Sequence, residues 1–300
     1  MFLLAIILSF TGYAIQGTLM AKYAREMDGL STVVYRSGSL IFTMLPLLFF
    51  ASWAEIRGIS DYWLEISLAG ITAVVGSALS FYSMKFMPVG IKNIFSKIIG
   101  TLWAIVLGFL FFHESITLTQ AILMALVLIA GYMLSREKND FDHLDNNIWK
   151  GLVLTFFSQI IVGISFYYVS YVSRELSPYV AGYFWEALIG IFAIIIVAFR
   201  PLYDGKKLYK ISFREFLKIA GICSLTLFGT GGFLYAVNHG NYAITNVLMN
   251  GSVFVSILVA HYAFEEKMTK RQWIWIIALV AGIVALNYSQ EISEFFGSLI

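Results

Sequence analysis

The chain has 300 residues, of which 59% are hydrophobic and only 13% are charged, and its mean hydropathy is +0.80. This composition excludes a water-soluble domain, and with it a soluble enzyme or a nucleic-acid-binding protein. We therefore expect an all-α membrane protein that lies in the lipid bilayer, because helices satisfy their own backbone hydrogen bonds in lipid.

Apolar runs bounded by glycine, proline or charged residues predict ten transmembrane helices. About 20 residues of helix cross a hydrocarbon core of about 30 Å, so ten spans leave only short connections in this chain. The first run lacks a basic region ahead of it and an obvious cleavage site, so we expect it to be retained as a helix. The predicted spans are residues 2–23, 31–53, 63–84, 88–112, 119–135, 149–172, 179–199, 213–237, 241–264 and 272–289.

A long polar connection at residues 136–150 divides these spans into two groups of five. We predict a first five-helix domain at 1–137, a connecting loop at 138–148, a second domain at 149–290 and a tail at 291–300.

The two groups repeat each other in sequence. The segment FFHESITLTQ at 111–120 corresponds to AFEEKMTKRQ at 263–272, with a glutamate, a threonine and a glutamine in the same places. Because each repeat has an odd number of helices, the second copy must enter the membrane from the opposite side. We therefore predict two inverted repeats around a central cavity, which is typical of secondary transporters with a substrate site near the midplane.

These features resemble the ten-helix branch of the drug/metabolite transporter superfamily, with two EamA-like domains. The resemblance rests on the two segments above, the Ala-Gly pairs at 130–131 and 281–282, and Arg36 early in the second span. It implies a multi-pass transporter, expected in the inner (plasma) membrane of a prokaryote. It also implies a small-molecule metabolite as substrate, and export as the direction of transport.

Ionisable side chains inside predicted spans are candidate site residues, because each costs at least about 2.5 kcal/mol to insert and asks for a partner or a watery cavity. They are Arg36, Lys92, Lys97 and Glu186, and Lys97 is the deepest of the cations. Three cations against one carboxylate favour a zwitterionic or anionic ligand. Glu186 could pair with Arg36 or could titrate and couple transport to protons.

Two asparagine-containing faces correspond under the repeat. Asn93 and Lys97 lie four residues apart on one helix, as Asn246 and Asn250 do on its counterpart. We predict that all four line the substrate site, although interhelical hydrogen bonding would also explain the asparagines.

Several other polar residues are weaker candidates. Gln16, Gln159 and Trp185 could face the cavity. We interpret Glu114 and Glu266, at helix ends, as structural, and His261 as an interfacial histidine. Cys223 is the sole cysteine and is expected to be a packing residue.

The sequence favours a secondary transporter of a small polar metabolite, such as an amino acid, by alternating access. A phosphate-ester or nucleotide-sugar exchanger is an alternative within transport, and a channel or a membrane-embedded binding protein is an alternative outside it. We find no HExxH pair, GxSxG elbow or phosphate-cradling loop, so no enzymatic activity, cofactor or metal is expected. Protons are a possible coupling ion, and no oligomeric state is implied.

Two arguments on orientation disagree. Of the 20 lysines and arginines, 15 belong to odd-numbered connections and only Arg57 and Arg174 to even-numbered ones. The positive-inside rule then places both termini outside the cytoplasm. Members of the family that the chain resembles are usually drawn with both termini inside.

Overall fold

The computed structural model describes residues 1–86, 89–135, 148–203, 205, 207–264 and 270–289, apart from a few side chains within these ranges. The described chain is almost entirely helical and contains no strand. The predictions for Glu266 and for the side chains of Asn93 and His261 lie outside the described part.

The helices agree with the predicted spans to within a few residues at most ends. The first domain contains α1 (Phe2–Glu26), α2 (Gly29–Thr43), η1 (Leu45–Phe50), α3 (Trp53–Gly58), η2 (Ile59–Tyr62), α4 (Trp63–Ser83), α5 (Val89–Phe111) and α6 (Leu118–Ser135). The second contains α7 (Ile148–Glu175), α8 (Pro178–Tyr203), α9 (Phe213–Cys223), α10 (Thr226–His239), α11 (Tyr242–Leu248), α12 (Gly251–Phe264) and α13 (Lys270–Asn287).

Ten membrane spans result from these helices. Among the described residues, six helical segments are long and apolar enough to cross a bilayer by themselves. Shorter apolar helices within α5, α6 and α13 supply three more, and α11 with α12 forms the remaining span. The prediction of ten helices in two five-helix repeats is therefore confirmed.

Two spans of the second domain are interrupted, which hydropathy did not reveal because both sides of each break are apolar. One interruption separates α9 from α10 at Ser224 and Leu225, and the other separates α11 from α12 at Met249 and Asn250. Interrupted helices near the midplane are common around transporter binding sites.

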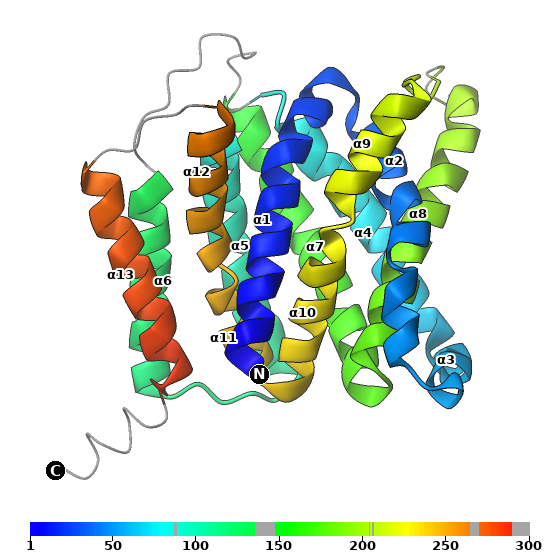
Figure 1. Ribbon diagram of the computed structural model, residues 1–300. Helices are drawn as coiled ribbons and strands as arrows, with labels where there is room; N and C mark the ends of the chain where they lie inside the picture. Colours follow the sequence, from blue (N-terminus) through cyan, green and yellow to red (C-terminus); the bar gives the residue numbers. More distant parts are fainter. Residues whose placement is uncertain (87–88, 136–147, 204, 206, 265–269, 290–300) are drawn as a thin grey trace, which may run out of the picture.

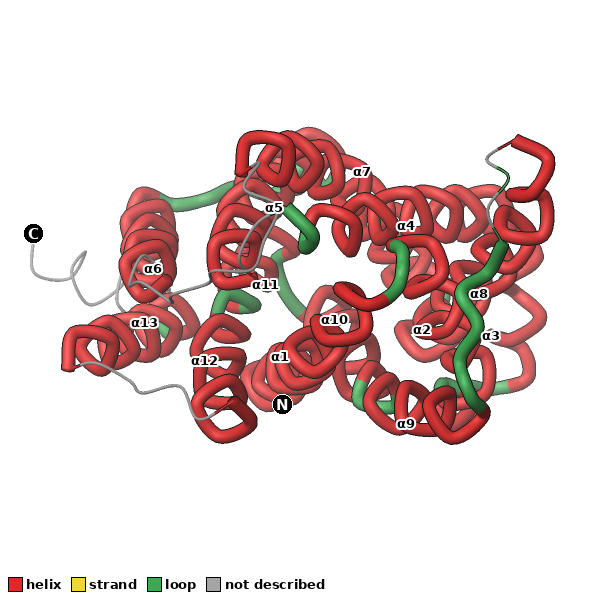
Figure 2. Tube along the Cα trace, turned by 90° about the horizontal axis from the view of Figure 1, so that it is seen from above, coloured by secondary structure: helices red, strands yellow, loops and turns green. Residues whose placement is uncertain are grey.

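The helices of the two domains interleave as a two-fold axis between inverted repeats requires. The third span of each domain packs against the first span of the other, as α4 with α7 and α10 with α1. The second spans pair as α2 with α8, and the fifth spans as α6 with α13, which form one edge of the molecule (Figures 1 and 2).

Matching hydrogen bonds confirm this relation at the level of single residues. The Ser9 hydroxyl on α1 donates to the carbonyl of Gly229 on α10 at 2.6 Å. The Ser158 hydroxyl on α7 donates to the carbonyl of Gly76 on α4 at 2.8 Å. The serines lie 149 positions apart and the glycines 153 positions apart. One bond is therefore the repeat copy of the other.

Small residues allow these helices to approach closely. A Cβ atom on Gly232 of α10 would lie 2.4 Å from the carbonyl oxygen of Ala5 on α1. A Cβ atom on Gly76 of α4 would lie 2.5 Å from a methyl carbon of Val162 on α7. Helix association in lipid depends on such contacts, since the hydrophobic effect does not drive it there.

Candidate functional site

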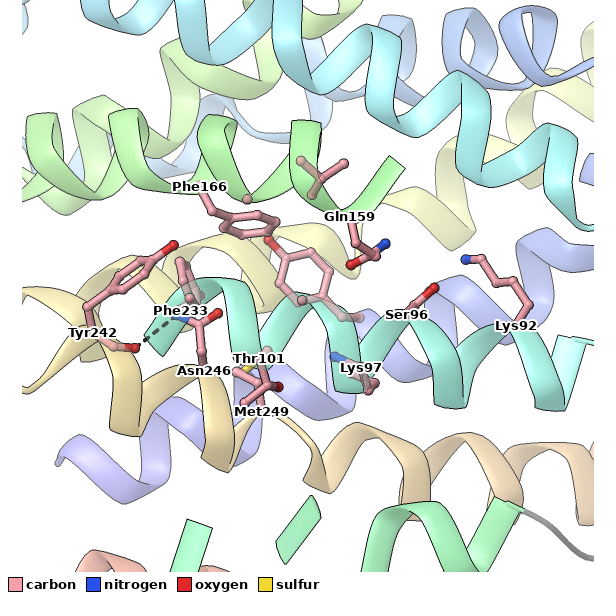
Figure 3. Close-up of a pocket in the computed structure, with 15 residues that line it drawn as sticks. Lys92, Ser96, Lys97, Thr101, Gln159, Phe166, Phe233, Tyr242, Asn246 and Met249 are labelled. Atoms are coloured by element: carbon pink, nitrogen blue, oxygen red, sulfur yellow. Dashed lines mark hydrogen bonds between the residues drawn. The ribbon is translucent and has the colours of Figure 1, made fainter. Parts of the chain in front are cut away.

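A cavity of about 260 Å³ lies where α1, α5, α7, α10 and α11 meet (Figure 3). It is therefore built from both domains, as the inverted repeat predicts. Its lining residues are Tyr13, Lys92, Ser96, Lys97, Gly100, Thr101, Ala104, Gln159, Val162, Gly163, Phe166, Phe233, Tyr242, Asn246 and Met249.

Helix α5 supplies one continuous wall of the cavity. Its lining residues recur at intervals of one, three and four positions from Lys92 to Ala104, so they occupy a single face of the helix. The apolar residues of its other faces, including Leu102 and Val106, are exposed on the surface of the bundle, where lipid would lie. The helix thus brings two lysines into the interior because its polar positions follow the helical period.

The cavity wall is cationic. Lys92 and Lys97 both line it, and no aspartate or glutamate does so among the described residues. The ion pairs found in the described chain join Arg36 to Glu186, Arg174 to Glu114 and Arg200 to Asp28. Neither lysine therefore has a carboxylate partner in that part of the protein.

Four of the predicted site residues line the cavity: Lys92, Lys97, Gln159 and Asn246. Figure 3 shows Lys92 at one end and Asn246 toward the other, with Gln159 and Lys97 between them. The Asn246 side-chain NH2 group donates to the backbone carbonyl of Tyr242 at 2.9 Å. The side-chain oxygen of Asn246 takes no part in this bond.

Asn250 is not among the residues that line this cavity. Its amide donates to the Thr101 hydroxyl at 3.1 Å and to the Val247 carbonyl at 2.8 Å. Asn250 lies at the break between α11 and α12, where its side chain can satisfy a backbone carbonyl that a continuous helix would use. The interhelical hydrogen bond, the alternative interpretation of the asparagines, applies to this one.

Trp185 and Gln16 also lie behind the wall rather than on it. The Trp185 indole donates to the Ser165 hydroxyl at 2.9 Å and packs edge-on against Phe166, which does line the cavity. Gln16 is buried on α1 beside Cys223 of α9. Each of these side chains supports a neighbouring helix instead of facing the open space.

Arg36 and Glu186 form the ion pair that was one of the two alternatives for them. The two guanidinium–carboxylate contacts are 3.2 and 3.3 Å, and Glu186 is only 1% exposed. The Thr230 hydroxyl donates to the same carboxylate at 3.0 Å, and the Tyr13 hydroxyl lies 2.7 Å from that of Thr230. The pair is thus connected to the cavity wall through two hydroxyl groups.

Sequence reasoning missed the aromatic part of the lining. Tyr13, Phe166, Phe233 and Tyr242 stand in apolar helices, where hydropathy does not separate lipid-facing rings from cavity-facing ones. The sequence repeat could have indicated one pair of lining positions. Val162 lies 149 positions after Tyr13 in the corresponding helix, and both residues line the cavity.

Glu114, which is 9% exposed, is bonded to the backbone of Tyr242, a lining residue at one end of the cavity. One carboxylate oxygen accepts from the backbone N–H of Tyr242 at 2.6 Å, and the other accepts from that of Ala243 at 3.0 Å. Arg174 at the end of α7 binds the same carboxylate at 2.9 Å. Glu114 therefore caps the positive N-terminal end of α11 and joins it to α7.

Arg174 extends this junction, which we call the Glu114 latch (Glu114, Arg174 and the N-terminus of α11). Its guanidinium also donates to the carbonyls of Val237 and Gly240, at 3.1 and 3.0 Å, and lies 4.2 Å from the centre of the Phe112 ring. The latch thus connects the end of α5 in the first domain to three helices of the second.

Comparison with known proteins matches the chain to a protein family and to solved structures. A family model described as the EamA-like transporter family matches residues 1–136 and again residues 149–288. A solved structure described only as "Crystal structure of protein" superimposes with a TM-score of 0.68 at 12% identity, covering 94% of this chain and 96% of that one. At this identity the likeness shows the fold alone. No curated protein sequence matches the chain.

Proposed function

Because the chain belongs to the EamA-like transporter family and is thus a multi-pass membrane transporter of the drug/metabolite superfamily, we propose that it carries a small polar metabolite through the cavity described above. The substrate is zwitterionic or anionic, such as an amino acid or another carboxylate. Transport is secondary and proceeds by alternating access. Family resemblance supports export as its direction and the inner membrane of a prokaryote as its location.

The observation that carries this proposal is the pair of lysines in the cavity wall. Lys92 and Lys97 lie inside the bundle without a carboxylate partner among the described residues. A buried cation without a counter-ion is costly, so a substrate anion would relieve that cost when it binds. Phosphate esters share this charge. However, a cavity of about 260 Å³ lies below the range of about 300–1,000 Å³ usual for drug-sized ligands, which disfavours a nucleotide sugar.

The Glu114 latch supports alternating access rather than a continuous pore. With a few charged hydrogen bonds, it holds the α10–α11 connection against the end of α5 at the Tyr242 end of the cavity. Such bonds can be exchanged for bonds to water when the end opens. A rocking motion of the two repeats about the cavity would break this contact and form another at the opposite end.

Counterflow in proteoliposomes tests the proposal. Vesicles loaded with an unlabelled metabolite should accumulate the same labelled compound transiently, which neither a channel nor a binding protein would do. We expect Lys97→Gln to abolish counterflow, whereas Lys218→Gln, which changes an exposed lysine on α9, should leave it unchanged. Equal counterflow in the two variants across a panel of amino acids, carboxylates and sugar phosphates would remove Lys97 from the site.

A further inference from the structure

The cavity has two chemically different halves. Figure 3 shows Lys92, Ser96 and Lys97 in one half, and the rings of Phe166, Phe233 and Tyr242 in the other, where the Asn246 amide also lies. A ligand that fills both halves must therefore be amphipathic, with a charged end and an apolar end.

The aromatic half is rigid. The Phe166 ring packs edge-on against Phe233, with centroids 5.0 Å apart, and against Trp185 at the same distance. Tyr242 is fully buried and its backbone is held by Glu114. Rings fixed in this way present a defined apolar surface, which suits a flat or branched hydrocarbon group.

One unpartnered donor accompanies the lysines. The Ser96 hydroxyl in the cationic half is buried and has no hydrogen-bond partner in the described part of the structure. Buried hydroxyl groups are normally paired, so this one is available to a ligand oxygen. A carboxylate placed here would neutralise a lysine and accept from the serine at the same time.

To a positively charged group the cavity offers the neutral amide oxygens of Gln159 and Asn246, but no carboxylate among the described residues. The two carboxylates connected to lining residues are already engaged: Glu114 is bound to Arg174 and to two backbone N–H groups, and Glu186 is bound to Arg36 and Thr230. An ammonium group in the cavity would meet two lysine charges and no available carboxylate among the described residues. Neutral amide oxygens would compensate its desolvation only in part, and the repulsion from the two lysines would remain.

We infer that the ligand is an organic carboxylate without an ammonium group, whose carboxylate lies beside Lys97 and Ser96 and whose apolar or aromatic end lies between Phe166 and Phe233. This inference rests on the proposed function for the identity of the site. It narrows the substrate class from zwitterions and anions to amphipathic anions.

Binding to the purified full-length protein tests the chemistry through three compounds that share a 2-phenylethyl group. These are 3-phenylpropanoate, with a carboxylate only, phenylalanine, with both groups, and 2-phenylethylamine, with an ammonium only. We expect 3-phenylpropanoate to raise the unfolding temperature and to bind about tenfold or more tightly than phenylalanine, and 2-phenylethylamine to have no effect. Butyrate, which lacks the ring, should bind more weakly than 3-phenylpropanoate.

Variants assign the two ends of the ligand. Lys97→Gln should remove the stabilisation by 3-phenylpropanoate, and Phe233→Leu should reduce its advantage over butyrate, while Lys218→Gln should change neither. Phenylalanine binding as tightly as 3-phenylpropanoate, or no stabilisation by any of the four compounds, would overturn the inference. The wild-type comparison needs no variant to fold.

Counterflow separates this inference from the proposed function. A compound that binds but shows no counterflow would contradict transport while leaving the ligand chemistry intact. Counterflow of amino acids without any binding of 3-phenylpropanoate would support transport and refute the amphipathic anion.

Discussion

Removing the negative charge of Glu114 should open the Tyr242 end of the cavity. In Glu114→Gln, the neutral amide can still accept from one backbone N–H of α11, but the second acceptor oxygen and the ion pair with Arg174 are lost. Hydrogen bonds to a charged group contribute about 1.5–3 kcal/mol each. Arg174 is 24% exposed and keeps its two carbonyl partners, so part of this loss is recovered by solvent.

We therefore expect the closed form to lose about 2 kcal/mol relative to the open form, which corresponds to about a 30-fold change in their ratio. The assay is the rate at which a membrane-impermeant thiol reagent modifies Met249→Cys, in a background in which the sole native cysteine, Cys223, is replaced by alanine. Intact cells and inverted vesicles expose opposite faces. Modification should become faster from one face only, the one at the Tyr242 end.

Glu175→Gln is the matched control, because Glu175 neighbours Arg174 at the same end of α7 but is exposed. It should leave the rate of modification unchanged. Identical rates in the Glu114 and Glu175 variants would refute the latch. A faster rate of thiol modification from both faces of the membrane would indicate general loosening of the helix bundle instead of opening at one end.

Further predictions concern the buried polar groups. Arg36→Ala should destabilise the protein by about 3–5 kcal/mol in thermal unfolding, because Glu186 would be left buried and without its ion-pair partner. Wild-type stability of this variant would show that the pair is not structural. Glu186→Gln should keep the pH dependence of transport if the carboxylate is not the coupling group. Tyr242→Phe should unfold at nearly the same temperature as the wild type, since the buried hydroxyl that it removes has the Asn246 side chain as its neighbour but makes no hydrogen bond of normal geometry in the described structure. A loss of more than about 1 kcal/mol would contradict this. Burial opposes ionisation of Asp28, but hydrogen bonds from Ser31 and Arg200 outweigh it and hold its pKa below the ordinary value of 3.8. A lowered folded-state pKa makes its contribution to stability complete above pH 3.8 and lost as the pH falls through the lowered value, so Asp28→Asn should remove that part of the acid-dependent fall in unfolding temperature.

Most of the fold could be read from the sequence because lipid imposes a simple rule. A span must be apolar over a fixed length, and ten such runs with one polar connection leave few other architectures. The repeated segments at 111–120 and 263–272 then required inversion, since each domain has an odd number of spans. The packing of α4 on α7 and of α1 on α10 agrees with this expectation.

The cavity was predictable only in part. Lys97 and Lys92 could be predicted as site residues, because a charged side chain in an apolar span is costly to insert and is therefore informative. The hydrogen bonds of Asn250 could not be predicted, because a polar residue in lipid can bind a neighbouring helix as readily as a substrate, and its position at a helix break was not marked by composition. Phe166 and Phe233 gave no signal, since a ring facing lipid and a ring facing a cavity have the same hydropathy.

The sequence by itself determined that this chain crosses the membrane ten times as two inverted copies and carries buried cations in one of them. Only the tertiary structure decided which side chains share a cavity. It separated the lysines of α5, which have no carboxylate partner among the described residues, from the paired charges of Arg36 and Glu186. The physical reason is that insertion into lipid depends on each segment's own composition. Pairing depends on which faces of different helices meet, and the sequence of one helix does not contain that information.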